Sequence, residues 1–358
     1  MKIALLSYST KPRGGVVHTL ALAEALAALG EDVTVWTLGR GGDTGFFRPV
    51  SPAVRLRIVP FVDGPADETV GERVLRSIAT LRDAFDPTPY DIVHAQDCIS
   101  ANAVGRCVRT VHHIDHFTTP ELAACHERAI VEPYAHICVS TAVAEELRAV
   151  WGLSAEVIAN GVAYDRFATT DPTARARWRS RLGRYILTVG GIEPRKGSLD
   201  LLEAYALLRA EHPGIRLVIA GGETLFDYRD YRTRWESRAA ELGVDPVVLG
   251  QVADEELPSL VAAADAFAFP SLKEGFGLAA MEALAAGVPL VVRDLPVLRE
   301  VFGAAADFAA TPGRLATALG HVLTVEDPAR RAAGRELAAA HTWAEAARRH
   351  LALYRSLG

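Results

Sequence analysis

Two glutamates in the last third of the chain, Glu274 and Glu282, have a spacing and a setting that suit ligand binding. They flank a turn that contains Gly275 and Gly277 and opens a helix of small residues. Glycine has no Cβ, so the backbone of this turn can approach a ligand closely. The unbonded N–H groups at a helix start favour a diphosphate. Glu274 would reach from the turn into a crevice, whereas Glu282, about one turn inside the helix, would accept hydrogen bonds from vicinal hydroxyls such as those of a ribose.

The segments around this pair predict the elements that hold it in place. An apolar run at residues 266–269 precedes the turn, and a second one at residues 288–292 follows the helix. This order of strand, glycine turn, helix and strand is typical of half a parallel α/β sheet, whose ligand edge lies at the carboxyl ends of the strands. Two glutamates at this spacing occur by chance in many proteins, so the surrounding elements make the pair a candidate site.

A second turn with ligand-binding chemistry follows an earlier strand directly. Residues 190–197 read Gly-Gly-Ile-Glu-Pro-Arg-Lys-Gly and carry two adjacent cations, Arg195 and Lys196. An arginine can fork onto two phosphate oxygens and a lysine acts as a point charge, so the two suit a diphosphate. The alternative is a solvated basic turn without a ligand. A position on the same sheet edge as Glu274 would favour phosphate binding.

Strands and helices alternate along the whole chain, which predicts parallel sheets with helices on both faces. The 358 residues are enough for two domains with separate cores. We expect a first domain at residues 1–170, a linker in the arginine-rich stretch 171–184 and a second domain at residues 185–341. Expected strands lie at residues 3–8, 33–38, 56–61, 91–95, 108–114, 136–140 and 155–159, then at 186–189, 217–220, 247–249, 266–269 and 290–292; expected helices in the first half lie at 17–29, 67–85 and 121–134. An amphipathic helix at residues 343–357 ends the chain.

The composition is that of an ordinary globular protein, because half of the residues are hydrophobic and the net charge is −6. A mildly acidic chain gives no electrostatic case for nucleic acid as a partner. The first apolar stretch is too short for a signal peptide, and no apolar run approaches the roughly 20 residues that span a membrane. The four cysteines have no Cys-x-x-Cys spacing, so we expect free thiols in a reducing cytoplasm.

Three short segments of the first half follow predicted strands and are further candidates for binding. Gly14 and Gly15 either form a plain tight turn or let the backbone approach a ligand. Asp97 follows the strand at residues 91–95. Residues 110–117 contain three histidines and an aspartate, which could be read as a metal site. They lack a cysteine or glutamate partner at helical spacing, so we predict no metal there.

The segment from Glu274 to Glu282 resembles the Glu-x7-Glu signature of the retaining glycosyltransferases of the GT4 type, also called glycosyltransferase group 1. The resemblance covers nearly the whole chain. It implies the α/β GT-B fold, in which two Rossmann-like, doubly wound parallel-sheet domains face each other across a cleft that holds the active site. It further implies that the C-terminal helix, residues 342–358, packs back on the first domain. In that family the first glutamate contacts hydroxyls of the donor sugar and the second contacts the nucleotide ribose.

The same resemblance implies roles for residues in both halves. Lys196 matches the family's phosphate-binding lysine. Many members carry an arginine where this chain has Gly191, and Arg195 is predicted to substitute for it. His112 matches the histidine that lies beside the reacting sugar. The predicted donor site also contains the residues Gly14, Gly15, Gly275, Phe276, Gly277, Leu278, Gln251 and Val252. The predicted acceptor site contains the residues Asp97, His113, Asp115 and His116.

These residues together predict a retaining glycosyltransferase that moves a hexosyl group from a nucleotide-diphosphate sugar to a hydroxyl acceptor. The acceptor is a small molecule, a glycan or a lipid-linked compound, and a lipid would bring the chain to a membrane surface. The predicted catalytic residues are His112, Glu274, Lys196 and Arg195. The chain lacks an Asp-x-Asp motif, so no metal is expected, and no cofactor is expected because the nucleotide sugar is a substrate. The alternatives are a GT-B sugar-nucleotide epimerase or phosphorylase, a glycoside hydrolase that uses the two glutamates as acid and base, and a non-catalytic nucleotide-binding protein.

Overall fold

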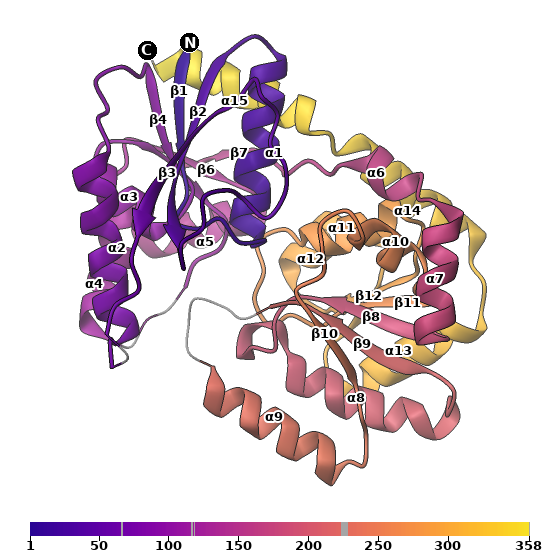
Figure 1. Ribbon diagram of the computed structural model, residues 1–358. Coiled ribbons are helices and arrows are strands. Elements are labelled where there is room, and N and C mark those ends of the chain that lie inside the picture. The colour runs from indigo at the N-terminus through magenta and orange to yellow at the C-terminus, as the bar shows by residue number, and fades with distance from the viewer. Residues whose placement is uncertain (66, 116, 118, 223–227, 358) are drawn as a thin grey trace. The chain divides into compact units, whose positions relative to one another are not determined.

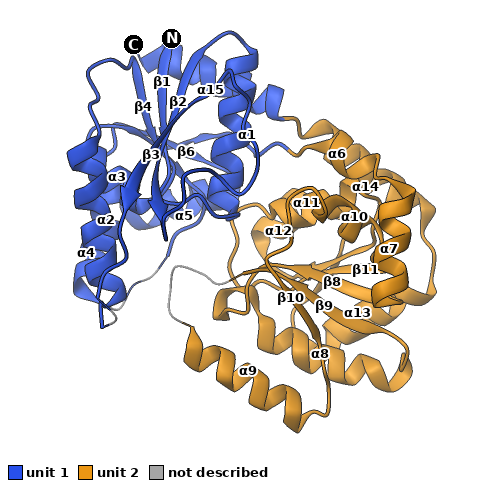
Figure 2. Cartoon of the chain, viewed as in Figure 1, with its two compact units in different colours: residues 1–161, 343–358 blue, residues 162–342 orange. Residues whose placement is uncertain are grey.

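The structure is a computed structural model of residues 1–358, and it describes all of them except residues 66, 116, 118, 223–227 and 358. The chain divides into two compact units (Figure 2). Unit 1 comprises residues 1–161 and 343–358, and unit 2 comprises residues 162–342. Each unit is built on one sheet, and all the strand pairs of both sheets within the described residues are parallel (Figure 1).

Unit 1 has a seven-stranded sheet in the order β3-β2-β1-β4-β5-β6-β7. Helices α2, α3 and α4 pack side by side on one face of this sheet, and α1 and the C-terminal α15 pack together on the other (Figure 1). The elements are β1 (Lys2–Leu6), α1 (Gly14–Ala28), β2 (Asp32–Arg40), β3 (Arg55–Phe61), α2 (Val70–Ala84), β4 (Ile92–Ala95), α3 (Cys98–Val104), β5 (Val108–Val111), α4 (Pro120–Val131), β6 (Ala135–Cys138), α5 (Thr141–Trp151), β7 (Glu156–Val157) and α15 (Trp343–Leu357).

Unit 2 has a six-stranded sheet in the order β10-β9-β8-β11-β12-β13. Its elements are α6 (Tyr164–Ala168), α7 (Pro172–Leu182), β8 (Tyr185–Val189), the 3₁₀ turn η1 (Pro194–Lys196), α8 (Ser198–Glu211), β9 (Arg216–Ala220), α9 (Arg229–Glu241), β10 (Val247–Gly250), α10 (Leu257–Ala262), β11 (Ala266–Phe269), α11 (Leu278–Ala285), β12 (Leu290–Arg293), α12 (Pro296–Phe302), the 3₁₀ turn η2 (Gly303–Ala305), β13 (Asp307–Ala309), α13 (Pro312–Thr324) and α14 (Pro328–Ala340).

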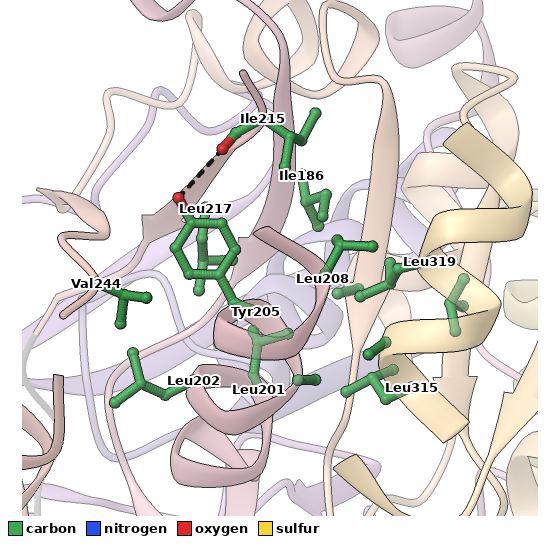
Figure 3. Close-up of a cluster of buried hydrophobic side chains, with 14 of the residues drawn as sticks. Ile186, Leu201, Leu202, Tyr205, Leu208, Ile215, Leu217, Val244, Leu315 and Leu319 are labelled. Carbon is green, nitrogen blue, oxygen red and sulfur yellow. Dashed lines mark hydrogen bonds between the residues drawn. The ribbon is translucent and has the colours of Figure 1, made fainter. Parts of the chain in front are cut away.

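The core of unit 2 shows why its strands read as continuous apolar runs. Leucines of α8 and α13 pack on the sheet around Tyr205, which is 4% exposed (Figure 3). The Tyr205 hydroxyl donates to Ile215 O at 3.1 Å, so the one polar atom of this side chain is satisfied inside the core. A sheet covered by helices on both faces is buried on both faces, which removes the polar alternation of a half-exposed strand.

Several boundaries differ from those expected from the sequence. Helix α1 begins at Gly14 and not at residue 17, so Gly14 and Gly15 form its first turn. The stretch 171–184 is not a linker, because it contains α7, and the compact unit 2 already begins at Val162. Its Trp178 and Leu182, four positions apart, are buried on one face of the helix, which packs on α10, while its arginines lie on the remaining surface.

The predicted strand at residues 108–114 ends earlier, at Val111, because its last partner in the sheet is Cys138 of β6. His112 therefore lies just beyond the strand and not in it. The expectation of free thiols is confirmed, since none of the four cysteines forms a disulfide. Burial raises the pKa of the Cys98, Cys107 and Cys138 thiols to about 12, which makes them poor nucleophiles.

Candidate functional site

The cation turn (residues 190–197) and the glutamate turn (residues 270–277) both leave the centre of the unit 2 sheet. The cation turn follows β8 and the glutamate turn follows β11, and these two parallel strands are neighbours. The strand order reverses between them, and open α/β sheets bind ligands at that point, beyond the carboxyl ends of the strands. The two turns therefore share one edge of the sheet, which favours phosphate binding over a plain basic turn.

The charged side chains of the two turns contact one another. Glu274 Oε1 accepts a hydrogen bond from Lys196 Nζ at 2.6 Å and another from Arg195 Nη1 at 3.1 Å. The Glu274 side chain is 10% exposed. Arg195 also pairs with Glu193 at 3.3 Å, and the Lys196 ammonium lies 5.2 Å from the centre of the Phe269 ring. This network fixes two cations and two carboxylates at the ligand edge of the sheet.

The backbone between the two glutamates supplies further hydrogen-bond donors. Gly277 has φ of 100°, a conformation that side-chain-bearing residues avoid, and a Cβ there would lie 3.1 Å from the Phe302 ring. Helix α11 begins with the next residue. Its first backbone bond runs from Met281 N to Gly277 O, so the N–H groups of residues 278–280 have no partner within the helix. These N–H groups and the positive end of the helix suit an anion.

Glu282 lies on α11, one helical turn after Leu278, and is partly buried. Within the part of the chain that the structure describes, no group donates a hydrogen bond to its carboxyl group. Burial raises the pKa of Glu282 to about 8; Arg166 opposes the rise and Asp254 reinforces it. The carboxyl group of Glu282 is therefore largely neutral near pH 7 and has no hydrogen-bond donor from the described residues, which leaves it open to ligand hydroxyls.

The remaining predicted donor residues of unit 2 differ in their surroundings. Gly275 is buried and Leu278 is partly buried in the glutamate turn. Phe276 is 3% exposed and its ring packs 5.7 Å from that of His341, so this side chain belongs to the core. Gln251 is exposed and Val252 is partly buried directly after β10, at the same edge of the sheet.

In unit 1 the first turn of α1 and the end of β5 come together. The His112 ring lies against Gly15, where an added Cβ would be 3.7 Å from Nε2 of the ring. Burial holds the pKa of His112 well below its usual range, and the neighbouring His18 lowers it further. His112 is therefore neutral near pH 7. Its Nε2 atom is buried without a hydrogen-bond partner among the described residues.

His18 is a neighbour of His112 that the sequence analysis did not single out. It lies one turn after Gly14 on α1, and its ring centre is 4.8 Å from that of His112. His18 Nδ1 donates to Asn160 Oδ1 at 2.8 Å, and the rings of Trp343 and His350 from α15 pack on it. The only signal of this position in the sequence is the four-residue spacing from Gly14, which places His18 on the same face of α1 as Gly14.

The predicted acceptor residues of unit 1 do not form one cluster. Asp97 caps α3, because its carboxylate accepts bonds from Ser100 N at 2.8 Å and Tyr8 N at 3.0 Å. His113 Nε2 lies 3.2 Å from Asp115 Oδ2, and both side chains are partly exposed. His116 lies outside the described residues.

Two searches of the described residues bear on metals and membranes. No group of three or more histidines, cysteines, aspartates or glutamates in these residues has an arrangement that could hold a metal ion. None of the helices in the same residues is long and apolar enough to cross a membrane.

Two doubly wound α/β units of this kind define the GT-B fold of glycosyltransferases, and solved GT-B structures match it. Sucrose-phosphate synthase from Thermosynechococcus elongatus has a TM-score of 0.80 at 22% identity and covers 99% of this chain and 98% of that one. The Anabaena protein Alr3699/HepE, solved in complex with UDP and glucose, has a TM-score of 0.74 at 21% identity and covers 99% and 100%. At these identities the likeness establishes the fold.

Sequence comparison gives the family. The family model for glycosyltransferase family 4 matches residues 12–166, and that for glycosyl transferases group 1 matches residues 173–335. The D-inositol 3-phosphate glycosyltransferase of Mycolicibacterium smegmatis is 31% identical over 409 residues, which covers 99% of this chain and 90% of that protein. The chain belongs to the GT4-type group 1 glycosyltransferases, as the Glu-x7-Glu segment predicted.

Proposed function

We propose that this glycosyltransferase moves a hexosyl group from a nucleotide-diphosphate sugar to a hydroxyl acceptor with retention of the anomeric configuration, and without a metal. One observation carries the proposal. Lys196 and Arg195 converge on Glu274 at the switch point of unit 2, and the unsatisfied carboxyl group of Glu282 lies on the helix that follows. Two cations, two carboxyl groups and a helix N-terminus at one sheet edge match the parts of a nucleotide sugar.

Each group has a distinct role in this proposal. When the bond between the sugar and the diphosphate breaks, negative charge develops on the leaving phosphates. Lys196, Arg195 and the first N–H groups of α11 stabilise that charge, and preorganised donors of this kind contribute several kcal/mol. The phosphates and Glu274 compete for the same N–H donors of Lys196 and Arg195, so donor binding frees Glu274 to accept hydrogen bonds from sugar hydroxyls. Glu282 accepts hydrogen bonds from the ribose.

The groups of unit 1 act on the sugar in the same proposal. His112 is neutral, so it can donate one hydrogen bond to a sugar oxygen without carrying a charge. The His112 ring lies against Gly15 at the start of α1. The acceptor hydroxyl attacks from the face that the diphosphate leaves, and a phosphate oxygen takes its proton, as the family resemblance implies. Bond formation to the acceptor and cleavage of the donor phosphate bond thus balance without a protein nucleophile.

The relatives suggest the first substrates to test. The Anabaena protein was solved with UDP and glucose, and the mycobacterial relative is named for D-inositol 3-phosphate. UDP-, GDP- and ADP-hexoses should be screened for a rise in the melting temperature, because a ligand that binds only the folded state stabilises it by mass action. The donor that gives a shift is then incubated with hydroxyl acceptors, and nucleoside diphosphate release is measured.

A glycoside hydrolase is the second candidate, since one observation favours it. The pKa of about 8 keeps Glu282 largely protonated at pH 7, as the general acid of a hydrolase must be. A hydrolase has no need of the cations Lys196 and Arg195 beside Glu274. Cleavage of simple glycosides without nucleoside diphosphate release from any sugar nucleotide would overturn the transferase proposal.

A further inference from the structure

Arg293, the last residue of β12, has surroundings that its sequence position does not suggest. Its side chain is 6% exposed, and its guanidinium makes one contact with each of its three nitrogens. Nε donates to Pro270 O at 3.1 Å, Nη1 donates to Ala310 O at 2.9 Å, and Nη2 donates to the carboxylate of Asp200. A buried guanidinium that makes such bonds in three directions fixes the groups it touches.

Two of these partners border the candidate donor site. Pro270 is the first residue of the glutamate turn, four positions before Glu274. Asp200 lies in the first turn of α8, which begins directly after the cation turn. Arg293 therefore connects the start of the segment that carries Glu274 to the end of the segment that carries Lys196. Among the described residues, no hydrogen bond joins Arg293 to the side chain of Glu274 or of Lys196.

The backbones of the two turns are also in direct contact beside Arg293. Gly197 has φ of 64°, and a Cβ at this position would lie 2.2 Å from Pro270 O and 3.2 Å from Arg293 Nη2. Leu272 N donates to Arg195 O at 2.8 Å. The cation turn thus lies on the glutamate turn with no room for a side chain between them, and Arg293 holds the carbonyl group on which Gly197 rests.

We propose that Arg293 is a positioning residue for transfer: it holds the cation turn and the glutamate turn in register, so that Lys196, Arg195 and Glu274 meet the donor diphosphate and sugar together. This inference rests on the proposed function of the same site. It assigns Arg293 a part in turnover although it lies behind the groups that contact the donor. A displacement of about 1 Å at a reacting centre can cost about 100-fold in rate, so a change at this distance is measurable.

Three variants separate positioning from simple stabilisation. Arg293→Gln removes the charge and most of the donors, whereas Arg293→Lys keeps a charge near Asp200 but loses the three-way contact. Asp200→Asn weakens only the contact to α8, and its side chain is 35% exposed, so the fold should tolerate it. Arg330→Gln is the control for the loss of an arginine that pairs with aspartates of unit 2, because Arg330 pairs with Asp307 and Asp327 away from the two turns; its side chain is more exposed than that of Arg293, 34% against 6%.

Turnover and donor KM are measured for each variant, together with calorimetric affinity for UDP, GDP or ADP, whichever the wild type binds. We expect Arg293→Gln to lower kcat at least tenfold, Arg293→Lys and Asp200→Asn to lower it less, and Arg330→Gln to stay within twofold of the wild type. If Arg293→Gln does not fold, Arg293→Lys and Asp200→Asn carry the test. Wild-type kcat and nucleotide affinity in both would overturn the proposal, as would an equal loss in Arg330→Gln.

Hydrogen exchange distinguishes failure of this inference from failure of the proposed function. The Leu272 N–H bonds to Arg195 O and reports directly on the contact between the two turns. Its exchange should become faster in Arg293→Lys and Arg293→Gln and remain unchanged in Arg330→Gln. Unchanged exchange in the Arg293 variants would refute the positioning role even if transfer activity is found. Faster exchange in a protein that transfers no sugar would leave the role in holding the turns and refute only the proposed reaction.

Discussion

The substitution Glu282→Gln should make the protein more stable and its donor binding weaker. The folded-state pKa of this group is about 8, above its ordinary value of 4.5. The group therefore stabilises the fold fully only below pH 4.5, and this contribution is lost as the pH rises towards 8. Above pH 4.5, ionisation of Glu282 stabilises the unfolded chain by about 1.4 kcal/mol per pH unit. Over the 2.5 pH units up to pH 7, this lowers the unfolding free energy by about 3 kcal/mol.

Glutamine has nearly the shape of glutamate and does not titrate, so Glu282→Gln removes this cost. The gain in unfolding free energy should be about 1 kcal/mol at pH 5 and about 3 kcal/mol at pH 7. Scanning calorimetry measures it as a shift in the transition of unit 2, by about 2 to 4 °C per kcal/mol for a domain of this size. The transition of unit 2 is identified as the one whose melting temperature rises when nucleotide is added.

Donor affinity provides the second half of this test. If Glu282 accepts hydrogen bonds from ribose hydroxyls, its ionised form is the better acceptor, so wild-type affinity should rise from pH 6 to 8. Glu282→Gln should bind nucleotide several-fold more weakly and without that pH dependence. If the difference in unfolding free energy between Glu282→Gln and the wild type is the same at pH 5 and pH 7, Glu282 is not a buried carboxyl group with a raised pKa. An unchanged affinity would refute its contact with the ribose.

Three other predictions concern the remaining charged groups. Lys196→Ala should lower kcat by a factor of about 100 or more, because it removes stabilisation of the leaving phosphate, and should change the melting temperature little. Lys2→Ala at the start of β1 serves as the control. An equal loss of activity and stability in Lys196→Ala would count against a phosphate role. Burial lowers the pKa of His18 to about 3 and of His350 to about 4. Below pH 6.5 the unfolded chain therefore takes up protons that these two rings do not take up in folded unit 1. In urea unfolding between pH 6 and 4, unit 1 should lose about 1.4 kcal/mol of unfolding free energy per pH unit for each of the two histidines. A loss per pH unit smaller than that expected for one proton would contradict two buried neutral rings. A chelator should leave transfer unchanged, and strong inhibition would disprove metal independence.

The fold could be predicted from the sequence because both sheets are buried on both faces. Continuous apolar runs such as residues 266–269, separated by glycine turns and helices, leave few alternatives to parallel α/β units. The error at residues 171–184 has a physical cause. Helix α7 buries only Trp178 and Leu182 and exposes its arginines, so its composition resembles that of a linker.

The candidate site could be predicted only in part. Glycines next to charged residues identify turns at a sheet edge, which is how Lys196 and Glu274 were found. Arg293 could not be found in this way, because an arginine that ends an apolar strand looks like a solvated residue, and its partners Pro270 and Asp200 are distant in sequence. The neutral state of His18 also depends on packing by α15, which short-range patterns do not reveal. The cytoplasmic location stays a prediction.

The stereochemistry of the transferred sugar tests the central claim most directly. The protein is incubated with the nucleotide sugar that raises its melting temperature and with the acceptor that supports nucleoside diphosphate release, and proton NMR follows the anomeric signal of the first product. The account predicts stoichiometric release of nucleoside diphosphate and a product with the anomeric configuration of the donor, both abolished in Lys196→Ala. A product of inverted configuration, or sugar transfer that Lys196→Ala leaves intact, would contradict it.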